Sequence, residues 1–288
     1  MFVIIGLVVV FVCVFGGYWL AGGNLMVVAR AAPVEMLIIG GAALGAFIAA
    51  NGPKVIKETF AGVLGLLKGP KYGKADYVEL LKLLYEILMK IRKEGLMAIE
   101  AHVENPESSA IFQKYPKVLA DHHLLDFITD CLRLMVGGNM NPHELEAVLE
   151  AELETHHKET HAASHSVQIV ADGLPAFGIV AAVMGVVKTM GSVGLPPAEL
   201  GILIGAALTG TFIGILLAYG FVSPLASLLE QKLNESTKMF QCIKVTLLAS
   251  INGYAPAIAV EFGRKVLFST ERPSFSELET HVKGAKSR

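Results

Sequence analysis

Residues 200–229, LGILIGAALTGTFIGILLAYGFVSPLASLL, contain no Asp, Glu, Lys or Arg, although Glu199 and Glu230 flank them directly. An uncharged apolar stretch of this length is typical of a membrane span rather than of a helix buried in a water-soluble protein. The composition of the whole chain agrees, because only 17% of its 288 residues are charged and 53% are hydrophobic. We therefore predict an all-α membrane protein, and we exclude a soluble enzyme and a disordered chain.

Four stretches of the chain are apolar enough to be spans. They are residues 1–20, 36–50, about 167–187, and 201–228. The first stretch has neither the basic start nor the small-residue cleavage site of a removed signal peptide, so we expect it to be retained as a span. The sequence therefore predicts four transmembrane helices.

The positions of Lys and Arg predict the orientation of these spans. Residues 52–165 carry 13 of the 24 Lys and Arg residues, and residues 229–288 carry 9. Because basic loops stay on the cytoplasmic side, we expect both segments and both termini to be cytoplasmic. The predicted organisation is two spans in 1–51, a cytoplasmic helical domain in 52–165, two spans in 166–228 and a cytoplasmic tail in 229–288.

The cytoplasmic segments are predicted to be helical. Apolar residues at helical spacing indicate one long helix from Asp76 to about Val103. Further helices are predicted over 115–138 and over 142–157, the second with Asn141 as its N-cap. In the tail we expect a helix over 232–252, followed by an irregular stretch over 253–274.

None of the four stretches carries an Asp, Glu, His or Lys near its middle. A proton or sodium path through a bilayer needs a group there that binds and releases the ion. Either the chain conducts nothing, or a second protein supplies the carboxylate.

Asp172 and Pro175 lie together at the start of the third predicted span. Proline removes one helical hydrogen bond and frees the carbonyl of residue 171, which together with the carboxylate makes an oxygen-rich spot. This spot is either part of the lining of an ion path or an interfacial aspartate above a kink. Pro224 occupies a similar place in the fourth span.

Two further patterns leave alternatives open. The pairs Gly41/Gly45, Gly201/Gly205 and Gly210/Gly214 put small residues on one helix face, where they serve packing within the chain or between copies of it. Histidines recur at His157, His161 and His165, but no Cys or carboxylate set completes a metal site. The three cysteines show no disulfide pattern, and the net charge of −2 gives no reason to expect a nucleic-acid partner. We predict no cofactor.

The segment IRKEGLMAIE at residues 91–100 carries the charges Arg92 and Glu100. A charged stripe on a helix is usually a solvated face. The alternative is a docking surface that engages a partner through opposite charges, which favours fast and reversible contact.

Four sequence segments together resemble the MotA family of flagellar stator subunits. They are DGLPAFGIVAAVMGVV (172–187), GTFIGILLAYGFVSPLA (210–226), KMFQCIKVTLLASINGYAPAIAVEFGRK (238–265) and YPKVLADHHLLDFITDCLRLMVGGNMNPHELEAVLEAELETH (115–156). The resemblance implies a pentameric ring in the lipid of the bacterial inner membrane, built around a MotB dimer whose transmembrane aspartate is the missing ion-binding group. It also implies that ion flow turns the ring against the rotor protein FliG.

The resemblance also implies roles for individual residues. Arg92 and Glu100 stand where the family has its rotor-contacting charges. Pro175 and Pro224 match prolines that couple ion passage to movement, with Asp172 beside the first of them. Two more positions, Thr211 and Ala182, match the pore: Thr211 is a pore-facing threonine, and Ala182 stands where sodium-driven relatives carry a second threonine.

These matches predict the transported ion. Sodium requires several oxygen ligands, and the methyl group of Ala182 supplies none, so we expect protons. A related alternative is an energiser similar to ExbB or TolQ, although such proteins usually have three spans placed differently. A solute transporter acting alone would need a polar site near the bilayer midplane, and a purely structural scaffold would need no ion path at all.

Overall fold

The computed structural model describes residues 2–67, 69, 71–138 and 141–284, and within these it divides into two compact units. Unit 1 comprises Met1–Gly69 and Thr160–Gln231, and unit 2 comprises Pro70–Glu159 and Lys232–Arg288. All regular structure in the described ranges is helical, in agreement with the predicted fold class. Met1, at the start of the first predicted span, lies outside the described residues.

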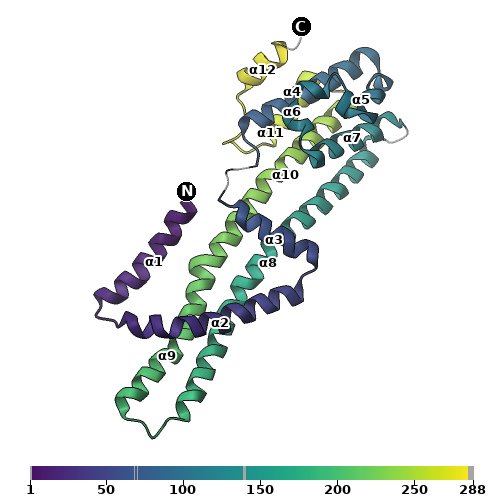
Figure 1. The fold of residues 1–288 in the computed structure, drawn as a ribbon. Coiled ribbons are helices and arrows are strands. Elements are labelled where there is room, and N and C mark those ends of the chain that lie inside the picture. The colour runs from purple at the N-terminus through teal and green to yellow at the C-terminus, as the bar shows by residue number, and fades with distance from the viewer. Residues whose placement is uncertain (1, 68, 70, 139–140, 285–288) are drawn as a thin grey trace. The chain divides into compact units, whose positions relative to one another are not determined.

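Among the described residues, four helices are long and apolar enough to cross a membrane, and their apolar parts belong to unit 1. Figure 1 shows them as α1, α2, the later part of α8, and α9 with its continuation into α10. Their bounds, with the short α3 and the π-helix η4, are α1 Phe2–Leu20, α2 Leu25–Ala50, α3 Pro53–Gly65, α8 Pro142–Met190, α9 Pro197–Ile215, η4 Leu216–Val222 and α10 Ser223–Ile251. Helix α1 buries none of its residues against this chain, which leaves its apolar surface available to lipid or to other subunits.

Helix α2 begins eleven residues before the predicted start of the second span at residue 36. The helix begins early because Asn24, a favoured N-cap residue, caps it: the backbone N–H of Met26 donates a 3.0 Å hydrogen bond to Oδ1 of Asn24. The helix then continues through Pro33. As a result Glu35 lies inside an apolar helix and not before it.

Helix α8 begins as predicted but is much longer than predicted. Asn141 and Glu144 form a reciprocal capping box, in which the Glu144 N–H donates to Asn141 Oδ1 at 2.9 Å and the Asn141 N–H donates to Glu144 Oε2 at 3.0 Å. No Gly or Pro follows His157 until Gly173, so nothing ends the helix there. It runs without interruption to Met190.

The fourth apolar helix changes its hydrogen-bonding pattern just before Pro224. Residues Leu216–Val222 form a π-helix, η4, and α10 starts at Ser223. Proline has no N–H to donate and its ring crowds the carbonyl one turn earlier, so a local shift to wider hydrogen-bonded rings accommodates it. Helix α10 then continues to Ile251, close to the predicted end at residue 252.

In unit 2 the predicted helix from Asp76 to Val103 is wrong as a single element. Helix α4 covers Lys74–Glu94 and ends at Gly95, whose φ of +88° is a conformation that favours glycine. Two short elements follow, η1 at Leu96–Ile99 and α5 at Glu100–Glu104. Arg92 and Glu100 are therefore on different elements.

The predicted helix over 115–138 is also divided. The short elements η2 Pro106–Ser108, η3 Phe112–Lys114 and α6 Pro116–Leu119 precede α7, His122–Val136. The predicted helix is divided at Asp121 because this residue is the N-cap of α7: its Oδ1 accepts a 3.3 Å hydrogen bond from the N–H of Leu124. Hydrogen bonds from the Tyr72 hydroxyl and the Lys71 ammonium hold the pKa of Asp121 below its usual value, against the opposing effect of burial.

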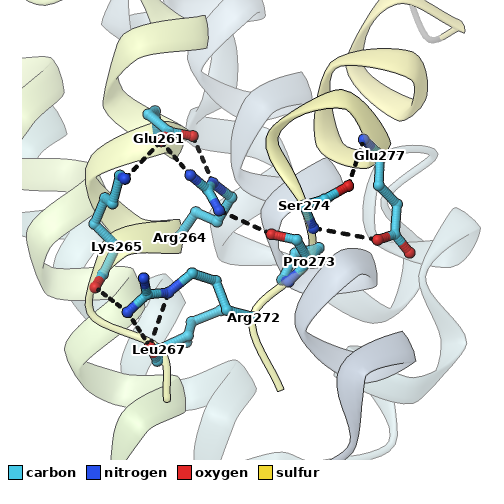
Figure 2. A network of polar contacts seen from close by, with 8 residues as sticks. All are labelled: Glu261, Arg264, Lys265, Leu267, Arg272, Pro273, Ser274 and Glu277. Carbon is cyan, nitrogen blue, oxygen red and sulfur yellow. Dashed lines mark hydrogen bonds and ion pairs between the residues drawn. The ribbon is translucent and has the colours of Figure 1, made fainter. Parts of the chain in front are cut away.

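The tail after residue 252 is more regular than predicted. Helix α11, Pro256–Lys265, packs on α4, and helix α12, Phe275–Gly284, follows it. Figure 2 shows the polar network that joins them: the buried Arg264 donates two hydrogen bonds to Glu261, at 2.6 and 2.7 Å, and one to the carbonyl oxygen of Pro273 at 2.9 Å. The expectation of an irregular stretch over 253–274 was wrong for residues 256–265, because Pro256 starts a helix there, and it is confirmed for residues 266–274.

Candidate functional site

Helices α8 and α9 approach closely at glycines within unit 1. A Cβ atom built on Gly214 of α9 would lie 2.8 Å from the carbonyl oxygen of Leu174 and 2.9 Å from the Cα of Gly178 on α8. These are backbone atoms, so no side-chain movement could make room. Gly214 therefore packs directly against the peptide bond that joins Leu174 to Pro175.

The same contact brings together the predicted pore positions. A Cβ atom on Gly178 would lie 3.4 Å from the Cα of Thr211, and one on Gly210 would lie 3.2 Å from the backbone nitrogen of Ala182. Ala182 is buried and Thr211 is half-buried. The structure thus places Pro175, Ala182 and Thr211 along one α8–α9 contact, a relation that the spacing of these residues in the sequence does not itself provide.

A chain of polar side chains links the two proline regions. The Gln168 side-chain N–H donates to Asp172 Oδ1 at 2.8 Å, and the Ser223 hydroxyl donates to Gln168 Oε1 at 3.4 Å. Ser223 is the residue before Pro224, and Asp172 lies three residues before Pro175. Gln168 and Ser223 were not among the predicted site residues. The signal that could have found them is that each is a polar residue in an apolar stretch, close to Asp172 or Pro224.

Glu35 is the third residue, after Gln168 and Ser223, for which the sequence predicts no role. It lies near the middle of α2, only 8% of its surface is exposed, and its Oε2 atom has no hydrogen-bond partner among the described residues. The expectation that no span holds a titratable group near its middle is therefore wrong for α2, because this helix begins at Leu25 and includes Glu35. Asn24, the N-cap, was the signal that would have extended the helix to include this residue.

Arg92 and Glu100 belong to unit 2, where both side chains are exposed. Arg92 lies in the last turn of α4 and Glu100 begins α5, so the turn at Gly95 sets their arrangement. Between them the side chain of Met97 is 65% exposed. Nearby, a 2.9 Å ion pair with Lys90 holds the pKa of Glu94 below its usual value. The result is an exposed surface of mixed charge that also includes apolar side chains, Met97 and, less exposed, Leu96.

The three small-residue pairs behave differently within one chain. Gly210 and Gly214 lie in the contact between α8 and α9, together with Gly178 and Gly185 of α8, which the sequence analysis did not pick out. By contrast, Cβ atoms on Gly41, Gly45 or Gly201 would meet nothing within 4 Å among the described residues. Among the described residues, Gly210/Gly214 is therefore the pair in which both glycines pack closely against another helix of this chain.

Four apolar helices, two of which pack together through glycines beside a proline, define a membrane protein with several spans. Residues 120–242 match the MotA/TolQ/ExbB proton channel family, and residues 4–95 match the model described as motility protein A N-terminal. The chain is 53% identical to motility protein A of Salmonella typhimurium over 287 residues. This alignment covers 100% of this chain and 97% of the relative. The chain belongs to the motility protein A family, whose members are motility proteins and not enzymes.

Other relatives and solved structures agree with this assignment. Motility protein A of Escherichia coli K12 is also 53% identical over 287 residues, and chemotaxis protein LafT of Vibrio parahaemolyticus is 42% identical over 96% of each chain. The fold resembles a chain of the C. jejuni MotAB structure, with a TM-score of 0.72, 21% identity and coverage of 94% of this chain and 98% of that one. It also resembles a chain of the flagellar MotAB stator complex from Bacillus subtilis, with a TM-score of 0.68, 24% identity and coverage of 90% and 92%.

Proposed function

We propose that this chain is the stator subunit that assembles with MotB into a proton-conducting complex and converts proton flow into torque on FliG. The family, and the MotAB complexes whose chains share its fold, support the partnership with MotB. The proposed location is the bacterial cytoplasmic membrane, with both termini in the cytoplasm. As the family resemblance implies, five copies would surround two copies of MotB.

The observation that carries this proposal is the hydrogen-bonded chain Asp172–Gln168–Ser223. It joins the region of Pro175 to the region of Pro224, where each helix lacks a normal backbone hydrogen bond. A change in the charge of a nearby carboxylate on MotB would act on both weakened helix segments together. This connection is what a machine that couples ion passage to helix movement requires, and a purely structural scaffold has no need of it.

Protons are the proposed ion, and no cofactor is proposed. Ala182 presents a methyl group where sodium-driven relatives have a hydroxyl, and it lies in the same α8–α9 contact as Thr211. One hydroxyl is a poor replacement for the hydration shell of sodium, whereas a proton needs only a carboxyl group and a water path. The carboxyl of MotB would be the main ion-binding group.

Vesicles test the conducting part of the proposal. Vesicles that contain this chain alone are expected to hold a pH gradient as well as empty vesicles do. Vesicles that contain the complex with MotB, in an active form, are expected to lose the gradient. A leak through this chain alone, equal to that of the complex, would contradict the proposed dependence on MotB.

Charge reversal tests the rotor part. We expect Arg92→Glu and Glu100→Lys to slow swimming while the complex still reaches the membrane, because exposed charges act mainly on encounter with a partner. The matched control is Glu146→Lys, which reverses an exposed charge of unit 2 on a different element, α8. If the double reversal of Arg92 and Glu100 swims normally, these side chains are only solvated and the assignment is wrong.

A further inference from the structure

Glu35 is an acidic side chain buried among apolar helices, and the proposed function gives it no role. Its exposed fraction is 8%, and Oε2 is fully covered without a hydrogen-bond partner among the described residues. A buried carboxyl with an unsatisfied oxygen costs free energy that an apolar residue of similar size would avoid. Packing alone therefore does not explain why a glutamate stands here.

The carboxyl of Glu35 occupies the space that the missing side chain of Gly210 leaves. A Cβ atom on Gly210 would lie 2.6 Å from Oε2 of Glu35, 3.1 Å from the Cβ of Ala181 and 3.2 Å from the nitrogen of Ala182. The carboxyl thus reaches from α2 to the place where α8 and α9 meet. It lies against Gly210, the residue that precedes Thr211.

A cavity of about 570 Å³ borders Glu35. Helices α2, α8 and α9 line it, and it is large enough for several water molecules. The charged side chains that line the cavity besides Glu35 are Arg30 of α2 and Lys188 of α8, while the residues that α9 contributes are Ile202, Leu203, Ala206 and Ala207. Lys188 and Arg30 belong to the helix ends that the sequence predicts to lie outside.

We propose that Glu35 is a proton-binding group of this chain, reached through the cavity from the outer end of the spans, and that it relays protons to the ion path beside Ala182 and Thr211. On release, the O–H bond of the carboxylic acid breaks, the proton passes to a water molecule, and a carboxylate remains. Uptake is the reverse step. This inference rests on the proposed function, and it adds a second carboxyl to the one that MotB would supply.

Infrared spectroscopy of the reconstituted complex with MotB tests the binding step. Wild type and Glu35→Gln are compared while pH is varied, in H₂O and in D₂O. We expect the wild type to show a C=O band of a protonated carboxyl that titrates, shifts in D₂O and is absent from Glu35→Gln. The control Glu199→Gln, at the exposed start of α9, should retain the band. Identical spectra for wild type and Glu35→Gln would overturn the proposal.

Proton flux into vesicles tests the relay step. Loss of a proton-transfer group typically slows transfer by about a hundredfold or more, and we expect a fall of this order in Glu35→Gln, with no change in Glu199→Gln. A Glu35→Gln complex that loses the band but conducts at the wild-type rate would overturn the relay. If Glu35→Gln does not assemble, Glu35→Asp replaces it: its shorter carboxyl should shift the band and slow the flux, and an unchanged band and flux would contradict the proposal.

The two arms separate this inference from the proposed function. If the wild-type complex carries no proton current, the proposed function fails, and the infrared difference still reports whether Glu35 binds and exchanges a proton. If the wild type conducts and Glu35→Gln matches it in band and in flux, only the role of Glu35 fails.

Discussion

Single side chains at the ends of the apolar helices connect elements that the sequence leaves unrelated. Gln168 contacts Asp172 on its own helix, α8, and Ser223 at the start of α10. Both contacts are partly open to solvent, and the second is long at 3.4 Å, so they add little to stability. Their importance lies in joining the Pro175 and Pro224 regions.

Replacing Gln168 by Leu removes both contacts at nearly constant volume. We expect swimming to slow markedly while thermal stability stays within about 1 kcal/mol of wild type, because each lost hydrogen bond is worth little in net free energy. Membrane yield and swimming speed are measured side by side, with Ser227→Ala, an exposed serine of α10, as the control. Normal swimming by Gln168→Leu would remove the coupling role from this chain of contacts.

The ion pair in the tail gives a pH dependence. The hydrogen bonds from Arg264 hold the pKa of Glu261 below its ordinary value of 4.5 (Figure 2). A carboxyl whose pKa is lower in the folded state stabilises the fold above the unfolded pKa, and this contribution is lost as pH falls through the folded value. Glu261→Gln should therefore flatten the fall in Tm of the purified complex below pH 4.5, whereas the exposed Glu107→Gln should leave its shape unchanged. A wild-type acid profile in Glu261→Gln would contradict this.

At the scale of elements, helix contacts in unit 1 depend on the absence of side chains. Gly178, Gly210 and Gly214 let α8, α9 and α2 approach until backbone and carboxyl atoms touch. The sequence predicted Gly210/Gly214 as a small-residue pair but could not say which of three similar pairs is used. Spacing along one helix carries no information on which neighbouring helix presents the matching small residue.

A methyl group at position 214 tests this packing. Gly214→Ala would place Cβ against Leu174 O and Gly178 Cα, and overpacking of this kind typically costs about 1–3 kcal/mol. We expect a lower Tm and a reduced yield of complex. Gly6→Ala, on α1, meets nothing within 4 Å and serves as the control. Equal stability of the Gly214→Ala and Gly6→Ala complexes would show that the helices can separate without cost.

Element boundaries were the least predictable part of the fold. The four apolar helices, the Asn141 cap and the end of α10 follow from local signals in the sequence. The turn at Gly95 was missed because apolar periodicity continues through it. The start of α2 was missed because the charges of Arg30 and Glu35, with Pro33 between them, interrupt the apolar stretch before residue 36. The proposed roles of Glu35 and Gln168 follow from contacts with other helices, and no local sequence pattern predicts such contacts.

At the scale of the whole molecule, the sequence separates the chain into apolar helices and charged helical segments, and each set has its own proposed task. Unit 1 holds the α8–α9 contact, Glu35 and the cavity, whereas unit 2 holds the exposed surface around Arg92 and Glu100. Helices α8 and α10 contribute residues to both units. The proposed account requires that proton flow through the first unit, with MotB, produces movement at the second.

The central claim is that protons drive this movement, and swimming speed without sodium tests it most directly. A strain that lacks its own stator genes and carries this chain with its MotB is tracked in potassium buffer from which sodium has been removed. The account predicts wild-type speed without sodium, and loss of speed when an added protonophore collapses the proton gradient. Speed that falls to zero without sodium, and returns when sodium is added at constant pH, would contradict the account.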